Sequence, residues 1–353
     1  MQKKAILRKK LSDFGVDGIL ITDLVNVRYL TGFTGTAGYL IITSKHALFV
    51  TDFRYKEQAA DEVKGCKIRI EHSERSGEIK EITDTYGIRR LGFEDHNVSY
   101  AFHEKLSKKK IGLKPLTGVT ESLRIVKTPA ELASMKTAVK RAEAAFSKLL
   151  PFIKQGATEE NLALKLEELL KKEGCKILPF GVIVASGFMS ALPHAKPTGK
   201  ALKKGDLVVF DWGGECDGYY SDMTRTVLLD GKNISRQKEL YNIVLEAHKR
   251  AGGAVKPGIT AAIVDTAARN YIDGKGYEEF FGHGTGHGVG LEVHEKPNVS
   301  WRSTEILKEN MVFTVEPGIY LPGFGGARIE DMVVVTKNGA ESLNTLSKKL
   351  MII

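Results

Sequence analysis

Cysteine is scarce in this chain of 353 residues, which contains only Cys66, Cys175 and Cys216. The three lie far apart and form no C-x-x-C pair, so the sequence predicts neither a disulfide framework nor a thiolate zinc site. Unpaired thiols of this kind are typical of a reducing compartment, and we therefore expect a cytoplasmic protein.

Long apolar runs are also missing. No stretch approaches the roughly 20 apolar residues that span a bilayer, and no apolar core follows the basic first ten residues, as it would in a signal peptide. We therefore expect no membrane association. The net charge of +9 comes from 52 basic and 43 acidic residues. Basic runs such as 105–114 have no interleaved aromatic residues, which favours solvated surface over a nucleic-acid interface.

Three familiar catalytic signatures are absent as well. There is no H-E-x-x-H segment, which excludes the one-zinc protease pattern, and no G-x-S-x-G elbow of a serine hydrolase. The glycine-rich stretch near residue 285 has no G-K-S/T ending, so it is not a phosphate-binding P-loop.

The hydrophobic pattern predicts two domains, 1–122 and 123–353. The first alternates helical and strand patterns, which is typical of an α/β layer structure. Its predicted helices are 3–14, 54–63 and 100–107, and its predicted strands are 17–22, 39–43, 47–51, 67–71 and 90–94.

The second domain begins near Thr128-Pro129-Ala130-Glu131, where a capping hydroxyl, a proline and a glutamate mark a helix start. Helices follow at 128–149, 158–172, 236–250 and 259–275, with strands after each pair, including 206–211 and 219–227. The order of helix, helix and strands occurs twice. This order predicts a duplicated α+β unit.

The stretch from Phe281 to Glu295 contains three histidines separated by glycines. Glycine this dense is unfavourable in a helix, so we expect a strand or extended loop. Alternate side chains of an extended segment share a face, which predicts that His283, Thr285 and His287 point the same way. The glycines would let another group approach the backbone closely.

Four acidic residues stand in otherwise apolar or glycine-rich strands: Asp211, Asp222, Glu316 and Glu330. Each alone is compatible with a structural salt bridge, because a buried carboxylate needs a partner. Together with His287 they form five oxygen and imidazole ligands. Such a set can hold two divalent ions, and its oxygen and imidazole ligands suit manganese, cobalt, iron or zinc. Two ions about 3.5–4 Å apart share a water and activate it, so the expected reaction is metal-assisted hydrolysis.

These motifs resemble the pita-bread metallopeptidases, the family of methionine aminopeptidase, aminopeptidase P and prolidase. The resemblance rests on the two aspartates eleven residues apart, on His-Gly-Thr-Gly-His-Gly at 283–288, on Glu-Pro-Gly at 316–318 and on Arg-Ile-Glu-Asp at 328–331. The segments 26–35, 48–55 and 124–132 resemble the N-terminal domain and the interdomain entry of the aminopeptidase P, prolidase and creatinase branch. The resemblance implies an α+β pita-bread catalytic domain after a smaller creatinase-like α/β domain.

The resemblance also implies a role for each ligand. Asp211 would bind one ion, and His287 and Glu316 the other, while Asp222 and Glu330 bridge the two. Manganese is the expected metal, with cobalt, zinc or iron as alternatives.

Four further residues take catalytic roles by the same resemblance. His194 and His283 would line the substrate pocket, and His294 would hydrogen-bond the scissile carbonyl. Arg328 would orient a ligand carboxylate, with Tyr320 beside it. An imidazole N–H in this place would stabilise developing negative charge.

The resemblance implies an Xaa-Pro aminopeptidase, which removes the residue before a proline by attack of a metal-bridging hydroxide. Prolidase, which splits Xaa-Pro dipeptides, is the alternative. Some prolidases carry an arginine at the position of Asn298. Its replacement by asparagine in this chain favours an aminopeptidase that acts on longer peptides, although Lys296 or Arg302 could take the place of that arginine. A metal-independent hydrolase of the creatinase kind and an idle binding module remain as remote alternatives. By analogy we expect a homodimer.

Overall fold

The chain folds into two compact units, one ending at Arg124 and the other beginning at Ile125, in a computed structural model that describes residues 2–353. The sequence predicted this division two residues earlier, after residue 122. Within residues 2–353, no helix has both the length and the apolar character needed to cross a membrane.

The N-terminal unit is built on a six-stranded sheet in the order β4-β3-β2-β1-β5-β6. Strand β1 pairs antiparallel with β2 and parallel with β5, so the sheet is mixed. Strands β2 and β3 are buried along their whole length, which explains their continuous apolar sequences. The strands are β1 (Gly18–Ile21), β2 (Tyr39–Thr43), β3 (Ala47–Thr51), β4 (Lys67–Ile70), β5 (Arg90–Glu94) and β6 (Gly112–Leu116).

Helices complete this unit and enclose two apolar cores. One core contains Phe33 and Phe49, and the other contains Tyr39 and Phe93. The helices are α1 (Gln2–Lys10), α2 (Leu24–Thr31), α3 (Lys56–Glu62), α4 (Arg75–Thr85), α5 (Tyr100–Ser107) and α6 (Glu121–Arg124), with a 3-10 turn η1 (Phe53–Tyr55). Helix α1 ends four residues before the predicted end at residue 14, because a turn follows Lys10.

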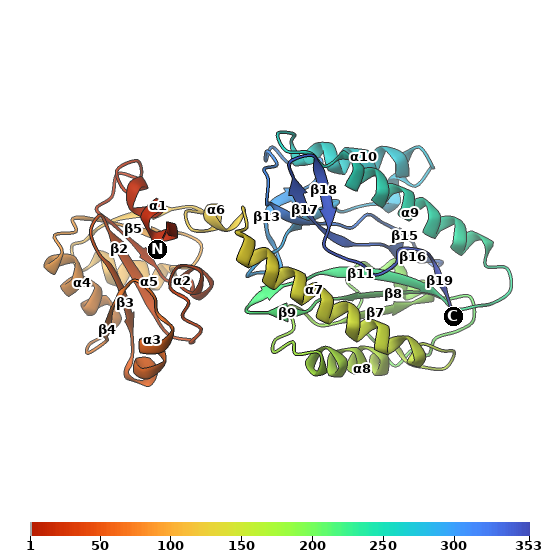
Figure 1. Cartoon of the computed structure of the whole chain (residues 1–353), viewed down its shortest axis with the longest axis horizontal. Helices are drawn as coiled ribbons and strands as arrows, with labels where there is room; N and C mark the ends of the chain where they lie inside the picture. Colours follow the sequence, from red (N-terminus) through yellow and green to blue (C-terminus); the bar gives the residue numbers. More distant parts are fainter. Residues whose placement is uncertain (1) are drawn as a thin grey trace. The chain divides into compact units, whose positions relative to one another are not determined.

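The C-terminal unit places its strands between two pairs of helices, with α7 and α8 on one side and α9 and α10 on the other (Figure 1). The helices are α7 (Pro129–Leu149), α8 (Glu159–Lys172), α9 (Ser235–Ala254) and α10 (Ala261–Asp273), with 3-10 turns η2 (Leu150–Phe152), η3 (Gly187–Ala191) and η4 (Glu278–Phe280). Thr128 and Glu131 form the predicted capping box at the start of α7.

Two sheets lie between these helices, one in each half of the unit. The first has the order β19-β11-β8-β7 and the second the order β13-β12-β14-β17-β18. Their strands are β7 (Ile183–Ser186), β8 (Leu207–Trp212), β11 (Met223–Leu228), β12 (Gly286–Gly288), β13 (Glu295–Val299), β14 (Val312–Val315), β17 (Asp331–Thr336), β18 (Gly339–Ser342) and β19 (Met351–Ile352). Two hairpins complete the unit, β9 (Glu215–Cys216) with β10 (Tyr219–Tyr220), and β15 (Gly318–Leu321) with β16 (Gly325–Arg328).

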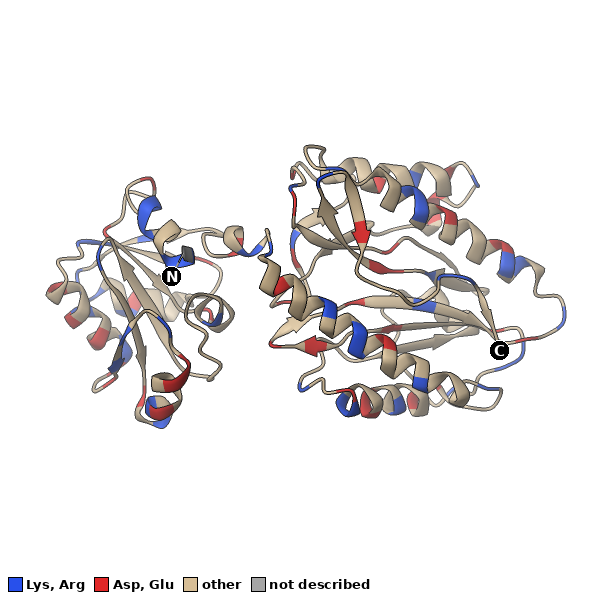
Figure 2. Ribbon diagram, in the orientation of Figure 1, with Lys and Arg blue, Asp and Glu red and all other residues tan. Residues whose placement is uncertain are grey.

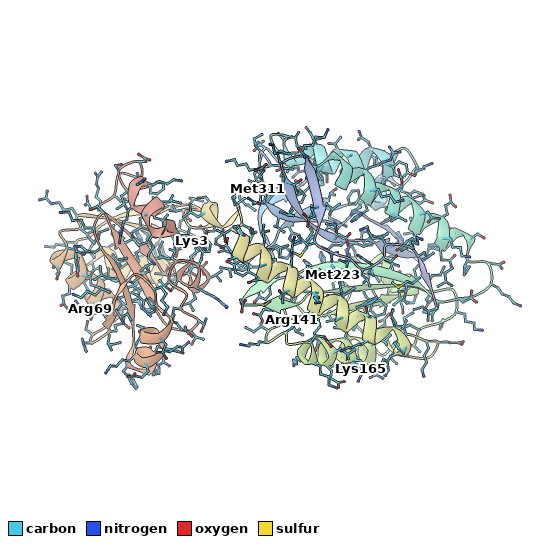
Figure 3. All side chains as sticks on the ribbon, in the orientation of Figure 1. Lys3, Arg69, Arg141, Lys165, Met223 and Met311 are labelled. Atoms are coloured by element: carbon cyan, nitrogen blue, oxygen red, sulfur yellow. The ribbon has the colours of Figure 1, made fainter. Side chains whose placement is uncertain are left out.

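The predicted order of two helices followed by strands, repeated once, is thus confirmed. The continuous strand predicted over 219–227 is wrong, because Ser221 and Asp222 separate β10 from β11. Met223, labelled in Figure 3, starts β11 inside the core that packs against α7 and α8. Lysines and glutamates are distributed along α8, and acidic residues also occur on strands between the helices (Figure 2).

Candidate active site

The C-terminal unit contains a cavity of about 740 Å³. The nine side chains predicted for the site all line it: His194, Asp211, Asp222, His283, His287, His294, Glu316, Arg328 and Glu330. They come from positions up to 136 residues apart, so only the folded sheets bring them together. The prediction of one shared site therefore agrees with where the structure places these residues.

The five candidate metal ligands lie on strands or directly beside them. Asp211 belongs to β8 and Asp222 immediately precedes β11, so both come from the first sheet. His287 belongs to β12, Glu316 follows β14 and Glu330 precedes β17, so these three come from the second sheet. The site is thus assembled from both halves of the unit.

His287 lies at the centre of this ligand group. Its Nε2 is 3.6 Å from Asp222 Oδ2 and 3.4 Å from Glu316 Oε1. Asp222, His287 and Glu330 each offer one ligand atom, and the three atoms lie within 4.8 Å of one another. His287 Nδ1 lies 3.1 Å from the carbonyl oxygen of Gly288 and must donate to it, which leaves Nε2 free as a metal ligand.

The carboxylates of this group have strongly perturbed protonation. Burial raises the pKa of Asp222 and of Glu330 well above the ordinary value, and neighbouring carboxylates raise it further. Burial also raises the pKa of Asp211, although Arg328 opposes the shift. For Glu316 burial is outweighed by the imidazoles of His287 and His283, and its pKa is lowered. Carboxylates placed so close together repel one another, and bound cations relieve that repulsion.

Asp211 provides an independent test of whether these residues suit a metal ion. One oxygen, Oδ2, accepts a hydrogen bond from Arg328 Nη2 at 2.6 Å. The other, Oδ1, is buried, and none of residues 2–353 donates a hydrogen bond to it. A buried oxygen without a partner is costly, so a missing ligand is expected there. The donor set of oxygens and one imidazole, without thiolate, fits divalent ions such as manganese, cobalt, iron or zinc.

Two threonines hold the ligand carboxylates, and the sequence analysis missed both. Thr224 Oγ1 donates to Glu330 Oε2 at 2.7 Å, and Thr314 Oγ1 donates to Glu316 Oε1 at 3.1 Å. Each lies two residues from an acidic candidate along a strand, Thr224 after Asp222 and Thr314 before Glu316. This spacing of two, which places side chains on one strand face, is the signal that could have identified them.

Arg328 connects the metal group to the histidine of the cavity wall. Besides Asp211, its guanidinium donates through Nη1 to Tyr320 Oη at 2.9 Å. Tyr320 Oη lies 3.0 Å from His283 Nε2, and His283 Nδ1 lies 2.7 Å from the carbonyl oxygen of Gly284. Because that carbonyl must accept from Nδ1, the tyrosine hydroxyl donates to Nε2. Burial lowers the pKa of His283, so this imidazole is neutral near pH 7.

The glycines of the histidine stretch allow close packing, as predicted. A Cβ atom on Gly286 would lie 1.9 Å from the carbonyl oxygen of Thr314, and one on Gly288 would lie 2.1 Å from that of Lys296. The prediction that Thr285 shares the face of His283 and His287 is wrong. Thr285 is fully buried, and its N and Oγ1 donate to Asp265 Oδ1 at 3.0 and 2.9 Å. The extended strand begins only at Gly286, so alternation does not yet apply.

The sequence pattern of metallopeptidase family M24 matches residues 133–337, and that of the creatinase/prolidase N-terminal domain matches residues 4–126. This chain belongs to metallopeptidase family M24. It is therefore a metal-dependent hydrolase, and the predicted combination of a creatinase-type N-terminal domain with a pita-bread catalytic domain is confirmed.

The similar proteins include Xaa-Pro dipeptidases as well as an X-Pro aminopeptidase. An Xaa-Pro dipeptidase from Pyrococcus horikoshii is 40% identical over 351 residues, which cover 97% of this chain and 98% of that one. The structure of an Xaa-Pro dipeptidase from Bacillus anthracis matches with a TM-score of 0.98 at 42% identity, covering 100% of this chain and 99% of the other. That of an X-Pro aminopeptidase from Thermotoga maritima matches with a TM-score of 0.90 at 37% identity, covering 98% and 100%.

Two further histidines line the candidate active site of this M24 peptidase. The ring of His294 lies 4.3 Å from that of His287, centroid to centroid. Burial first, and then the neighbouring imidazole of His287, lower the pKa of His294, which favours the neutral ring as a hydrogen-bond donor. His194 stands in the loop between η3 and β8 and lines the same cavity.

The outer walls of the M24 cavity contain residues that sequence analysis did not single out. Phe180, Val182 and Val293 give it an apolar surface, and the outward face of α8 adds others, including Leu164. Charged side chains also line it: Glu160, Glu167 and Lys196. Since these contacts join segments far apart in sequence, no local pattern could have identified them.

The N-terminal domain has its own cluster of Asp23, His96 and Glu121, whose ligand atoms lie within 4.8 Å of one another. His96 Nε2 lies 3.2 Å from Asp23 Oδ2 and 3.4 Å from Glu121 Oε1. Asp23 also caps α2 through Val25 N, and Glu121 accepts from Asn26. Hydrogen bonds and ion pairs within the domain thus hold these three side chains together, while Glu121 Oε2 is buried and accepts no hydrogen bond from residues 2–353.

Proposed function

We propose that this M24 protein is a dinuclear-metal exopeptidase that hydrolyses the Xaa-Pro bond at the N-terminus of peptides. The observation that carries the proposal is the convergence of Asp211, Asp222, His287, Glu316 and Glu330 on one cavity, with one buried aspartate oxygen left without a donor. The names of the similar proteins, Xaa-Pro dipeptidase and X-Pro aminopeptidase, support the substrate class.

The ligand geometry supports a site for two ions. Asp211 would hold one ion and His287 and Glu316 the other, while Asp222 and Glu330 would contact both. Two divalent ions, with manganese as our first choice, would lower the pKa of a water and stabilise negative charge on the scissile carbonyl oxygen. Carboxylates with raised pKa values suit this arrangement, because they release protons when cations bind.

The neutral imidazoles supply the remaining chemistry. His294 is close to His287 and lines the cavity, so its N–H would donate to the carbonyl oxygen as negative charge develops there. A series of hydrogen bonds from Asp211 through Arg328 and Tyr320 holds the imidazole ring of His283 in one orientation. His194 stands in a loop on the cavity wall, where it would accept or return a proton.

For substrate length, the aminopeptidase is the first candidate. Neither Asn298 nor the neighbouring cations line the cavity, as far as the described residues show. Lys296 Nζ pairs with Glu305, and the guanidinium of Arg302 lies over the Trp301 ring. No cation of this segment thus closes the cavity against a free carboxylate. The dipeptidase is the second candidate, because another cation, Lys196, does line the cavity.

The decisive experiment is hydrolysis of Ala-Pro and Ala-Pro-Ala after chelation and after return of manganese, cobalt or zinc. Release of alanine from the tripeptide is expected from an aminopeptidase, and cleavage of the dipeptide alone from a dipeptidase. No cleavage of either peptide with any metal would refute the proposed function. We also propose a homodimer, which light scattering on the purified protein would test.

A further inference from the structure

The loop between η3 and β8 brings two polar side chains to the cavity, His194 and Lys196. Ala195 between them is buried, with 6% of its surface exposed. The two outward residues of this segment therefore share one side, as alternate residues of extended chain do. A functional histidine and a lysine thus stand next to each other on the cavity wall.

Buried polar contacts fix this loop at both ends. On one side Ser190 Oγ accepts from Gly326 N at 2.8 Å. On the other side the carboxylate of Glu159, which is fully buried, accepts from Thr198 N at 3.2 Å and from Thr198 Oγ1 at 2.7 Å. The other oxygen of Glu159 accepts from Ser186 N at 2.8 Å. Lys196 is therefore carried on a braced loop and not on a free one.

The charges that line the cavity single out Lys196. Arg328 is the other lysine or arginine among the described lining residues, and Asp211 and Tyr320 occupy its guanidinium. The four ligand carboxylates would balance two divalent ions, so the metal centre would offer little net positive charge. Lys196 forms no ion pair with any carboxylate of residues 2–353, including Glu160 and Glu167, which line the same cavity.

The direction of a bound peptide follows from these charges. A peptide carboxylate is repelled by Glu160 and Glu167 of α8, which line the cavity, and is attracted by the ammonium group of Lys196. A short peptide whose first bond lies at the ligand carboxylates would therefore place its own carboxylate toward Lys196.

We propose that the ammonium group of Lys196 binds the C-terminal carboxylate of a short Xaa-Pro peptide and so determines the preferred substrate length. This inference rests on the proposed function. It assigns to Lys196 a role in substrate selection and none in the bond-breaking step. Peptides of two or three residues are then cleaved faster than longer ones, whose carboxylate lies beyond the loop.

The test compares each short peptide with its C-terminal amide, Ala-Pro with Ala-Pro-amide and Ala-Pro-Ala with Ala-Pro-Ala-amide. The variants are Lys196→Met, which keeps the apolar stem, and Lys196→Arg, which keeps the charge. Lys204→Met is the matched control, because Lys204 is an exposed lysine of the same loop that is not among the residues lining the cavity.

For whichever free peptide the wild-type protein cleaves faster, we expect kcat/KM to exceed that of its amide by about five- to tenfold, as for a partly solvated charge pair. Lys196→Met should bring this ratio to about one, with amides cleaved at the wild-type rate. Lys196→Arg should keep most of the ratio and Lys204→Met all of it. A wild-type ratio in Lys196→Met overturns the proposal, and so does an equal loss on acid and amide, which indicates a structural role.

A binding measurement separates this inference from the proposed function. Calorimetric titration of Ala-Pro and its amide into the metal-free protein needs no turnover. Tighter binding of the free acid by the wild type, about five- to tenfold, and equal binding of both by Lys196→Met support the role of Lys196 even if no peptide is hydrolysed. Equal binding of acid and amide by the wild type overturns it, whatever the activity.

Discussion

Glu330→Gln removes one negative charge from a buried group of four carboxylates and leaves the size of the side chain unchanged. Glu330 is 2% exposed, and its Oε2 accepts from Thr224 Oγ1, a bond that the amide oxygen of glutamine can also accept. Burial raises the pKa of Glu330 well above its ordinary value, and the charges of Asp222, Glu316 and Asp211 raise it further. In the absence of metal, the ionised side chain therefore destabilises the fold.

The sign of the pH dependence follows from the raised pKa. The folded protein keeps this proton at pH values where the unfolded chain has lost it, so the stabilisation is fully present below the unfolded pKa of about 4.3 and is lost as pH rises toward the folded pKa. At pH 8 the glutamine variant avoids burying an unpaired charge, a difference of about 1–3 kcal/mol. For a domain of about 200 residues this raises the melting temperature by about 2–12 °C.

Scanning calorimetry with a chelator at pH 5 and pH 8 measures this effect. We expect Glu330→Gln to melt above the wild type at pH 8, with a smaller difference at pH 5. Saturating manganese should reverse the order, because the wild type binds the ions more tightly. Hydrolysis should fall by at least about 100-fold. The reasoning is refuted if the variant melts below the wild type at pH 8 in chelator. Near-normal turnover at full metal content would refute the bridging role.

Three further substitutions test the surroundings of the ligands. Thr224→Val should weaken metal binding about 10- to 100-fold, because a ligand carboxylate loses its donor, and a metal titration that matches the wild type would contradict this. Tyr320→Phe should lower kcat about tenfold with little change in KM, because the hydroxyl no longer links imidazole and guanidinium; steady-state kinetics measure both constants, and an unchanged kcat would contradict the role. Gly286→Ala should destabilise the protein by about 3 kcal/mol in urea unfolding, since a Cβ there meets a carbonyl oxygen. The control Gly282→Ala, with no atom near its Cβ position, should change stability little, and equal effects would contradict the steric argument.

Elements with an apolar run between clear turn signals could be predicted closely from the sequence. The strands 39–43, 47–51 and 90–94 have the predicted bounds. The first two are buried along their whole length, and the third is buried from Leu91 to Glu94. The helix after Thr128 begins where its capping box indicates. Local hydrogen bonds and burial decide these cases, and both can be read from neighbouring residues.

The residues of the candidate site likewise fall into those that the sequence could identify and those that it could not. The acidic candidates stood out because charge in an apolar strand needs a partner, whereas the family resemblance implied the roles of His194, His283 and His294. The structure places all of them on one cavity. The direction of Thr285 was predicted wrongly, since a buried contact with Asp265 of α10 decides it. The position of Lys196 on the cavity wall, which α8 also lines, likewise depends on contacts between distant segments. Such pairings are fixed by tertiary packing, for which one sequence offers no local signal.

Because the candidate ligands come from two different sheets, metal binding would affect how long the polypeptide survives. Asp211 and Asp222 belong to the first half of the C-terminal unit, and His287, Glu316 and Glu330 to the second. Ions bound as proposed would therefore join the halves, and at 1,000 times the dissociation constant they would stabilise the fold by about 4 kcal/mol. Proteases act on the opened chain, so resistance to digestion reports metal occupancy. A cell short of the metal would thus lose the enzyme itself as well as its activity.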